Sequence, residues 1–456
     1  MNKPKYDLLN GSITPLLLKL STPMIVAFSF QTSFNFIDRY FVSRLGDVST
    51  AAIGMAFIIQ LIIIALGSGM GIGLNSYISR NLGAGKTGRA IQATLHSFLI
   101  ALVLGGAISI IGLLTHIYIF QLLGASGELL KAISEYLTII FIFAPIYLLG
   151  MLSNNIFRGW GDTIRPMKFM LTGTLLNIIL DPIFIFGWGF IPGMGIKGAA
   201  LATGISRSIA VLYTLFILFI KEIPIKLKLS DIHFDWRIIS GIFQVGFPAS
   251  IGQILTSFSI SLIFIILRNY GDEARAAYTI AFTYEMIAFQ PVIGIGQAIA
   301  IITGHNYGAQ QYQRIQKIYF TGIKITVAIM LLISVIVSTA PHFFSSVFAR
   351  SPRVLQLTTM ALRIMAPGYL FSGISLCTTT SFQGLGLGKY QLMATVFRIF
   401  ALILPFAWIG SLIWSINGVW TGMLFANFVM AIFLLAWFRN LYYKKLIKGK
   451  IKTLSG

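Results

Sequence analysis

The chain has 456 residues, of which 56% are apolar and only 10% are charged. A soluble domain usually carries about 25% charged residues, and a soluble protein does not tolerate this much exposed apolar surface. The composition therefore excludes an ordinary soluble enzyme or nucleic-acid-binding protein, although the formal net charge is +21. It indicates an integral membrane protein, and since one membrane-spanning helix needs about 20 apolar residues, the length accommodates about twelve.

Apolar runs separated by polar segments predict twelve spans in two groups of six. The first group lies at 15–40, 51–78, 91–120, 132–155, 166–187 and 198–220. The second group lies at 238–267, 276–303, 318–340, 355–382, 391–414 and 418–437. The polar stretch 221–237 predicts a cytoplasmic linker between an N-lobe, residues 1–220, and a C-lobe, residues 238–456 with a basic cytoplasmic tail.

The distribution of basic residues predicts the orientation. If the N-terminus is cytoplasmic, the inner loops and tails hold 21 of the 34 Lys and Arg residues, and Arg158 is one of them, in the loop after the fourth span. The outer loops then hold seven, which are Arg44, Lys131, Lys197, Arg268, Arg275, Arg350 and Arg353. Because short cytoplasmic loops carry an excess of Lys and Arg, we expect a multi-pass protein of the cell (inner or plasma) membrane with both termini inside.

The two halves match each other at a constant offset of 225 residues. Matching positions include Pro23 with Pro248, Gly46-Asp47 with Gly271-Asp272, Gly69 with Gly294, Gly71 with Gly296, Asn81 with Asn306, and Arg89 with Arg314. A repeat of six spans places both copies in the same orientation, related by a pseudo-two-fold axis along the membrane normal. The sequence thus predicts an all-α membrane protein of two six-helix bundles, an architecture in which transporters bind substrate between the halves.

Three of the 13 acids lie inside apolar spans, namely Asp38, Asp181 and Glu285. A charged residue at the centre of a span costs about 2.5–3.5 kcal/mol on insertion scales, so a functional role is expected. Asn177 and Asp181 are one turn apart on a helix and share a face. Together they offer oxygen ligands for a small cation such as Na⁺, and a desolvated Asp is also a candidate proton carrier. The alternative is that this pair joins two helices or neutralises Arg207.

The other two buried acids have structural alternatives as well. Asp38 lies beside Arg39 and 15 residues beyond Pro23, so it is either a coupling residue or half of a local ion pair near the end of the helix. Pro23 predicts a kink or hinge in the first span. Glu285 corresponds in the repeat to Gln60, and a coupling role and a packing role are equally open for it.

Other motifs argue against an enzyme. The run Gly67–Gly73 superficially resembles a dinucleotide-binding loop, but it lies within a span without a preceding strand, so we expect it to allow close helix packing. The five His and the single Cys377 form no metal-ligand spacing, and no nucleophile elbow or Walker loop is present. We therefore expect no cofactor other than a coupling ion, and transport driven by an ion gradient.

At this point the residues resemble the multidrug and toxic compound extrusion (MATE) family, in particular its prokaryotic branch with paired acids in the N-lobe. The resemblance covers nearly the whole chain. It rests on Pro23, Ile37-Asp38-Arg39, Asn81-Leu-Gly-Ala84, Arg158-Gly-Trp-Gly-Asp162, Asn177-Ile-Ile-Leu-Asp181-Pro182, Gly198-Ala-Ala-Leu-Ala-Thr203 and Pro291-Val-Ile-Gly-Ile-Gly-Gln297.

The resemblance implies a V-shaped pair of bundles that exports organic cations in exchange for H⁺ or Na⁺ by alternating access. It implies an ion-coupling cluster of Asp38, Asn177, Asp181 and Thr203, with Asp38 linked to bending at Pro23. Glu285 and Arg207 are secondary candidates, and Arg207 is a charge that the family pattern does not lead us to expect. The expected partners are cationic amphipathic drugs and membrane lipids, without nucleic acid, and the expected state is a monomer.

Two rival functions stay open at this point. A related lipid or lipid-linked oligosaccharide flippase would use cationic side chains for phosphate head groups, and four Arg residues lie within the predicted spans, namely Arg39, Arg207, Arg363 and Arg398. A membrane-embedded enzyme is the second rival.

Overall fold

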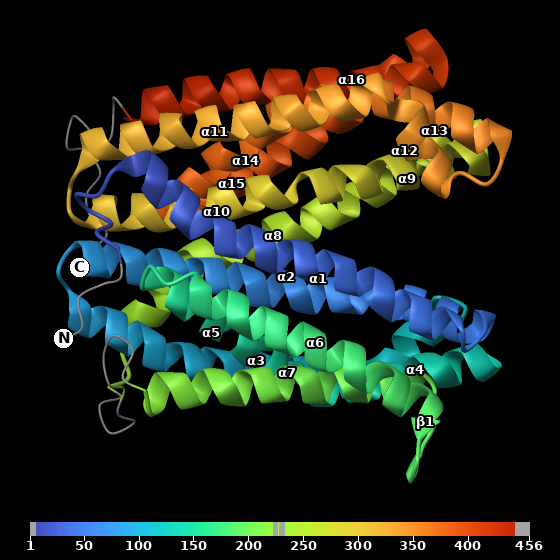
Figure 1. Cartoon of the computed structure of the whole chain (residues 1–456), viewed down its shortest axis with the longest axis horizontal. Helices are drawn as coiled ribbons and strands as arrows, with labels where there is room; N and C mark the ends of the chain where they lie inside the picture. Colours follow the sequence, from blue (N-terminus) through green and yellow to red (C-terminus); the bar gives the residue numbers. More distant parts are fainter. Residues whose placement is uncertain (1–5, 222–226, 228–232, 443–456) are drawn as a thin grey trace. The chain divides into compact units, whose positions relative to one another are not determined.

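The computed structural model describes residues 6–221, 227 and 233–442, without the side chains of residues 33–36, 38 and 39. Figure 1 shows the elements of the chain, nearly all of them helices. In chain order they are α1 (Ile13–Ser43), α2 (Asp47–Gly83), α3 (Thr87–Leu122), α4 (Gly127–Ile142), α5 (Ala144–Gly159), α6 (Ile164–Phe186), β1 (Gly187–Trp188), β2 (Ile191–Pro192), α7 (Ile196–Phe219), α8 (Trp236–Leu267), η2 (Arg268–Tyr270), α9 (Asp272–Ala288), α10 (Gln290–Gly308), α11 (Tyr312–Thr339), α12 (Pro341–Phe348), α13 (Pro352–Met365), α14 (Gly368–Gly384), α15 (Gly388–Val396), η3 (Phe397–Ile403) and α16 (Leu404–Leu441).

The helices confirm the predicted spans. Within the described residues, eight helical stretches are long and apolar enough to cross a membrane, and three bent helix pairs bring the number to 11. One stretch, Gly388–Leu441, has 54 residues, which is far longer than a bilayer requires. It breaks at Trp414 and Ser415, whose backbone angles are not helical, and this break separates the predicted eleventh and twelfth spans.

Proline explains the three bends between paired helices. The bends measure 51° between α4 and α5, 44° between α9 and α10, and 54° between α13 and α14. Pro145 and Pro291 lie in the first turn of the second helix of their pairs, and Pro367 directly precedes α14. Because proline has no N–H to donate to the preceding turn, the helix bends where it occurs.

The chain forms two compact units that share two helices. The N-unit contains Val26–Ser250, and the C-unit contains Leu8–Ile25 together with residues 251–442. The division therefore falls within α1 two residues after Pro23, and within α8 two residues after Pro248. The predicted lobe boundaries stay a prediction, and most of the predicted linker lies outside the described residues.

Glycines on α2 let two helices approach it within the N-unit. A Cβ at Gly71 would lie 2.8 Å from Cγ of Asn155 on α5, and a Cβ at Gly69 would lie 2.7 Å from Cα of Ser250 on α8. Residues two apart on a helix point to different sides, so the run Gly67–Gly73 serves both neighbours. This confirms that the run packs helices.

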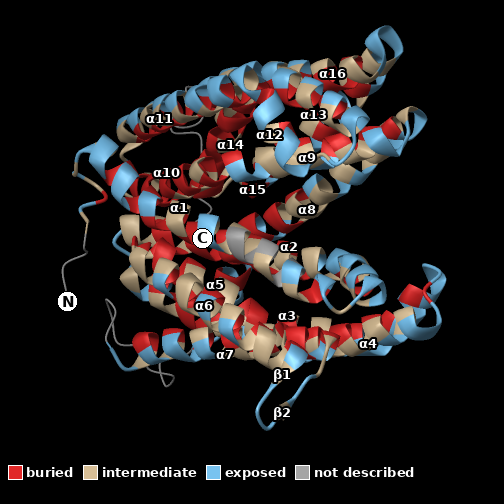
Figure 2. Cartoon of the chain, turned by 45° about the vertical axis from the view of Figure 1, so that its right-hand side comes forward, coloured by how far each residue is buried: buried red, intermediate tan, exposed pale blue. Residues whose placement is uncertain are grey.

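The same close approach recurs in the C-unit at the repeat offset. A Cβ at Gly294 on α10 would lie 2.5 Å from Cγ1 of Ile25 on α1. Gly294 and Gly69 are 225 residues apart, and so are Ser250 and Ile25. The internal repeat predicted from the sequence is thus present in the packing. Figure 2 shows the buried faces that result, most extensively on α10 and α14.

A two-stranded hairpin that the sequence analysis did not predict joins α6 to α7. Strands β1 and β2 pair antiparallel, with Gly187 opposite Pro192. Beyond the hairpin, the N–H of Met194 donates to the Phe184 carbonyl at 2.9 Å, and that of Gly195 to the Ile185 carbonyl at 3.1 Å. These bonds satisfy carbonyls at the end of α6 and start α7 directly against it.

Candidate functional site

Asn177 and Asp181 form a buried polar pair in the C-terminal half of α6. The Asn177 Nδ2 donates to the Asp181 Oδ1 at 2.6 Å, and the two residues are 3% and 0% exposed. They share the buried face of α6 with Thr174 and Ile185. The predicted geometry of an amide one turn above a carboxyl is therefore confirmed, and the carboxyl lies inside the N-unit rather than in lipid.

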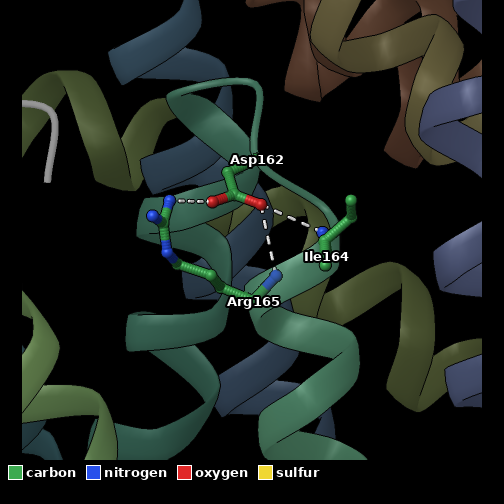
Figure 3. Close-up of polar contacts among 3 residues, drawn as sticks. All are labelled: Asp162, Ile164 and Arg165. Carbon is green, nitrogen blue, oxygen red and sulfur yellow. Dashed lines mark hydrogen bonds and ion pairs between the residues drawn. The ribbon is translucent and has the colours of Figure 1, made fainter. Parts of the chain in front are cut away.

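Asp162 caps the start of α6, the helix that carries this pair (Figure 3). Its Oδ1 accepts hydrogen bonds from the backbone N–H of Ile164 at 3.0 Å and of Arg165 at 3.2 Å, and its Oδ2 forms an ion pair with the Arg165 guanidinium. A carboxylate that accepts the first N–H groups of a helix caps it and complements its dipole. The role of Asp162 is thus to hold α6 in place.

Thr203 lies on α7, which packs tightly against α6. A Cβ at Gly198, near the start of α7, would lie 2.8 Å from the Ile185 backbone nitrogen. Thr203 is half-buried, and its Oγ1 donates to the Ala199 carbonyl one turn earlier at 3.0 Å. The structure thus places Thr203 on the helix beside the Asn177–Asp181 pair, and the hydroxyl bonds within its own helix.

Arg207 follows Thr203 by one turn and contacts an aromatic ring. Its guanidinium carbon lies 4.6 Å from the ring centroid of Tyr147 on α5, in cation–π geometry. Among the residues that the structure describes, Arg207 has no ion-pair partner. The alternative in which Arg207 holds the Asp181 carboxylate in a salt bridge is therefore not what the structure contains.

The first predicted coupling acid, Asp38, lies on α1, but its side chain is outside the described residues. Its contact with the Asn177–Asp181 pair therefore stays a prediction. Pro23 is buried within α1, which runs as one helix from Ile13 to Ser43.

Arg158 is a buried cation that the sequence analysis missed. It was predicted in a cytoplasmic loop, which is wrong, because it lies in the last turn of α5 and is only 7% exposed. Its Nη2 lies 3.9 Å from the Met170 sulfur, and its guanidinium carbon lies 5.3 Å from the Phe28 ring centroid. Its Nε has no hydrogen-bond partner among the residues that the structure describes. The apolar run of this span ends at Asn155, so hydropathy alone gave no signal that the helix continues.

The secondary candidate Glu285 lies on α9 in the C-unit, where it interacts electrostatically with Arg398 on η3. Its repeat counterpart Gln60 has a different environment, since the Gln60 Nε2 donates to the Tyr136 hydroxyl at 2.6 Å. Within the described part of the chain, no three His, Cys, Asp or Glu residues gather as metal ligands. Cys377 is fully buried, and its Sγ lies 3.1 Å from the Thr326 hydroxyl.

The N-unit interior combines a carboxyl–amide pair with two cationic side chains, Arg158 and Arg207, that contact aromatic rings. Such a carboxyl can take up and release a proton or a small cation.

Comparisons with known proteins agree with these features. The sequence profile of the MatE family matches residues 23–183 and again residues 248–409, so the two matched segments begin 225 residues apart, as the repeat does. The multidrug export protein MepA of Staphylococcus saprophyticus is 28% identical over 94% of this chain and 94% of its own length. A FAD transporter of Shewanella oneidensis is 27% identical over 94% of this chain and 95% of its own length.

Solved structures extend the similarity to the whole fold. A structure described as the outward-facing conformation of a multidrug resistance MATE family transporter of the MOP superfamily has a TM-score of 0.92 and 32% sequence identity. The match covers 97% of this chain and 98% of that one.

Proposed function

Because the chain belongs to the MatE family of transporters, we propose that it is a secondary antiporter that exports organic cations in exchange for H⁺ or Na⁺ by alternating access. The similarity to multidrug export proteins supports drug efflux, and it favours this function over lipid flipping. The observation that most directly supports ion coupling is the carboxyl–amide pair of Asn177 and Asp181, which is buried within a membrane-spanning unit.

The coupling ion binds at this pair. A carboxyl in such a low-dielectric place exchanges a small cation when its environment changes, and ion binding drives transport when the two conformations differ in affinity for the ion. We place Asp38 and Thr203 in the same cluster. The pair offers two oxygen-bearing groups one turn apart, which suits Na⁺ as well as a proton.

The experiment is efflux of ethidium from vesicles under an imposed pH gradient or an imposed sodium gradient, one at a time. Asp181→Asn and Asp38→Asn should abolish gradient-driven efflux while the purified protein stays folded in detergent. Asn177→Ala should weaken Na⁺ coupling more than H⁺ coupling, because only a metal ion needs the amide oxygen. Asp47→Asn, at an exposed acid on the first turn of α2, is the matched control. If both Asp variants exported ethidium as fast as the wild-type protein, the proposal that these carboxyl groups couple ion binding to export would be refuted.

A second candidate substrate is an anionic aromatic compound such as FAD, in line with the FAD transporter among the relatives. The observation that favours it is Arg158, whose buried guanidinium contacts a ring and a sulfur and, within the described chain, no carboxylate. FAD efflux from the same vesicles tests this candidate directly, since organic-cation export and FAD export need not occur together.

The expected setting is a monomer in the cell membrane with both termini in the cytoplasm. The excess of Lys and Arg in the predicted inner loops supports this orientation.

A further inference from the structure

Glu285 lies on the interior face of α9. Tyr278 and Ala281, which precede it by two turns and one turn, are both buried, whereas the next residue, Met286, is exposed. Residues spaced by three or four positions share a helix face, so Glu285 points into the C-unit rather than toward lipid. It is half-buried, and part of the side chain therefore stays accessible.

Arg398 lies on the interior face of a neighbouring irregular helix. It follows the buried residues Gln391 and Ala394 at helical spacing, and it is the second residue of η3, a seven-residue stretch of π-helix. Short π-helical segments inside membrane helices often occur at functional sites, because the wider turn redirects side chains. The Arg398 side chain is half-buried as well.

The two opposite charges attract each other without direct contact. Each is the principal charged neighbour of the other, and both interact electrostatically with the Tyr278 hydroxyl. Nevertheless, among the described residues neither the Glu285 side chain nor the Arg398 side chain forms a hydrogen bond or an ion pair with an N–O distance of 4.0 Å or less. Since the sequence contains no acid after Glu285, no later residue can neutralise Arg398.

Other polar atoms of the C-unit interior also lack hydrogen-bond partners within the described chain. The Arg398 Nε is buried without one, and so is the hydroxyl of Tyr369, which interacts electrostatically with Glu285. The Oε1 of Gln391, two turns before Arg398, is a third example. A buried donor or acceptor without a partner costs about 1–3 kcal/mol. Two such atoms at one charge pair, the Arg398 Nε and the Tyr369 hydroxyl, indicate a site for a polar ligand.

We propose that Glu285 and Arg398 bind the two charged ends of a zwitterionic substrate, with its ammonium group at Glu285 and its carboxylate or phosphate group at Arg398. This inference rests on the proposed transport function and adds zwitterionic compounds, bound at this pair, to the organic cations as a substrate class. A simple cation bound at Glu285 would be repelled by Arg398, and a simple anion bound at Arg398 would be repelled by Glu285. A ligand that carries both charges satisfies both side chains.

Three fluorescent probes that differ only in charge test the assignment. Nε-dansyl-lysine is a zwitterion, dansylcadaverine lacks its carboxylate, and dansyl-aminohexanoate lacks its ammonium group. Each is titrated against the purified full-length protein in detergent, and the dissociation constants are compared. The wild-type protein should bind the zwitterion about tenfold or more tightly than either single-charge probe, which is the size expected for one charge-assisted hydrogen bond.

Substitutions then assign each charge. Glu285→Gln should remove the advantage of the zwitterion over dansyl-aminohexanoate, and Arg398→Gln should remove its advantage over dansylcadaverine. Asp272→Asn, which removes an exposed ion pair with Arg275 at the start of the same helix, is the control and should leave all three constants unchanged. If a single variant does not fold, the charge-neutral double variant Glu285→Gln with Arg398→Gln should lose both advantages together.

The results separate this inference from the proposed function. Wild-type protein that exports ethidium but binds the three probes equally, or variants that retain the zwitterion preference, would overturn the inference alone. Absence of ion-driven ethidium export would overturn the proposed function, whatever the probe titrations show.

Discussion

Gly69 is predicted to be the least replaceable of three glycines in comparable helical positions. A Cβ at Gly69 would meet three atoms of Ser250, namely Oγ, the backbone nitrogen and Cα, the last at 2.7 Å. Backbone atoms cannot rotate away, so α2 and α8 would have to separate by about 1 Å to restore ordinary carbon contact distances of 3.5–4.0 Å. The Ser250 hydroxyl bond to the Leu66 carbonyl, 3.4 Å long, would be lost with that separation.

The expected magnitude follows from two opposing effects. Overpacking of a close contact costs about 1–3 kcal/mol, whereas replacement of a helical glycine by alanine contributes up to about 1 kcal/mol of helix propensity. Gly69→Ala should therefore lower the free energy of unfolding by about 1–2 kcal/mol. Gly294→Ala should cost less, because the nearest atom there is Cγ1 of the Ile25 side chain and the nearest backbone atom is 3.2 Å away.

Gly54→Ala on the same helix α2 is the matched control. No atom of the described residues lies within 4 Å of a Cβ at this exposed position. Only the higher helix propensity of alanine then acts, and the variant should be as stable as the wild-type protein or slightly more stable. The measurement is thermal unfolding of the purified proteins in one detergent. Equal midpoints for Gly69→Ala and Gly54→Ala would refute the assignment of the glycine run to close packing of α2 against α8.

Two further predictions concern helix ends. Asp162→Ala should destabilise the protein by about 1 kcal/mol. Asp162→Asn should retain most of that stability, because an amide oxygen also accepts the N–H groups of Ile164 and Arg165. The thermal midpoint of Asp162→Ala should therefore be lower than that of Asp162→Asn. Gln310 has φ +58°, and its repeat counterpart Gly85 has φ +71°. Because this left-handed conformation favours glycine, Gln310→Gly should stabilise the protein by up to about 1 kcal/mol. An unchanged or lower thermal midpoint would contradict this prediction.

The sequence was sufficient for features set by local geometry. Hydropathy located every span, because backbone groups in a membrane must be satisfied within helices and this leaves few alternatives. The Asn177–Asp181 hydrogen bond follows directly from the spacing of four residues on a helix. The prolines at the three bends were visible in the sequence, but whether each one bends a span or merely starts a helix depends on packing against neighbours.

Features that depend on contacts between distant segments could not be predicted. Nothing in the spacing of Arg207 indicates that it lies over Tyr147, and nothing near Arg158 indicates that its helix continues into a buried environment. The approach of Arg398 to Glu285 joins residues more than a hundred positions apart through an irregular π-helical turn, which hydropathy does not register. The hairpin between α6 and α7 is too short for a periodicity signal.

Comparison of the two repeat halves shows that the units share their helix packing but not their buried charged residues. The glycines that set helix contacts occur in both halves, as the Gly69–Ser250 and Gly294–Ile25 contacts demonstrate. The charged residues of the interior do not occur in both halves. Glu285 corresponds to Gln60, and the second half contains no acid after Glu285 that could correspond to Asp181. A duplicated scaffold whose packing is preserved while its buried charges differ is best explained by different ligands in the two units. We therefore propose that the carboxyl–amide pair of the N-unit exchanges the coupling ion and that Glu285 and Arg398 of the C-unit recognise the charges of the substrate.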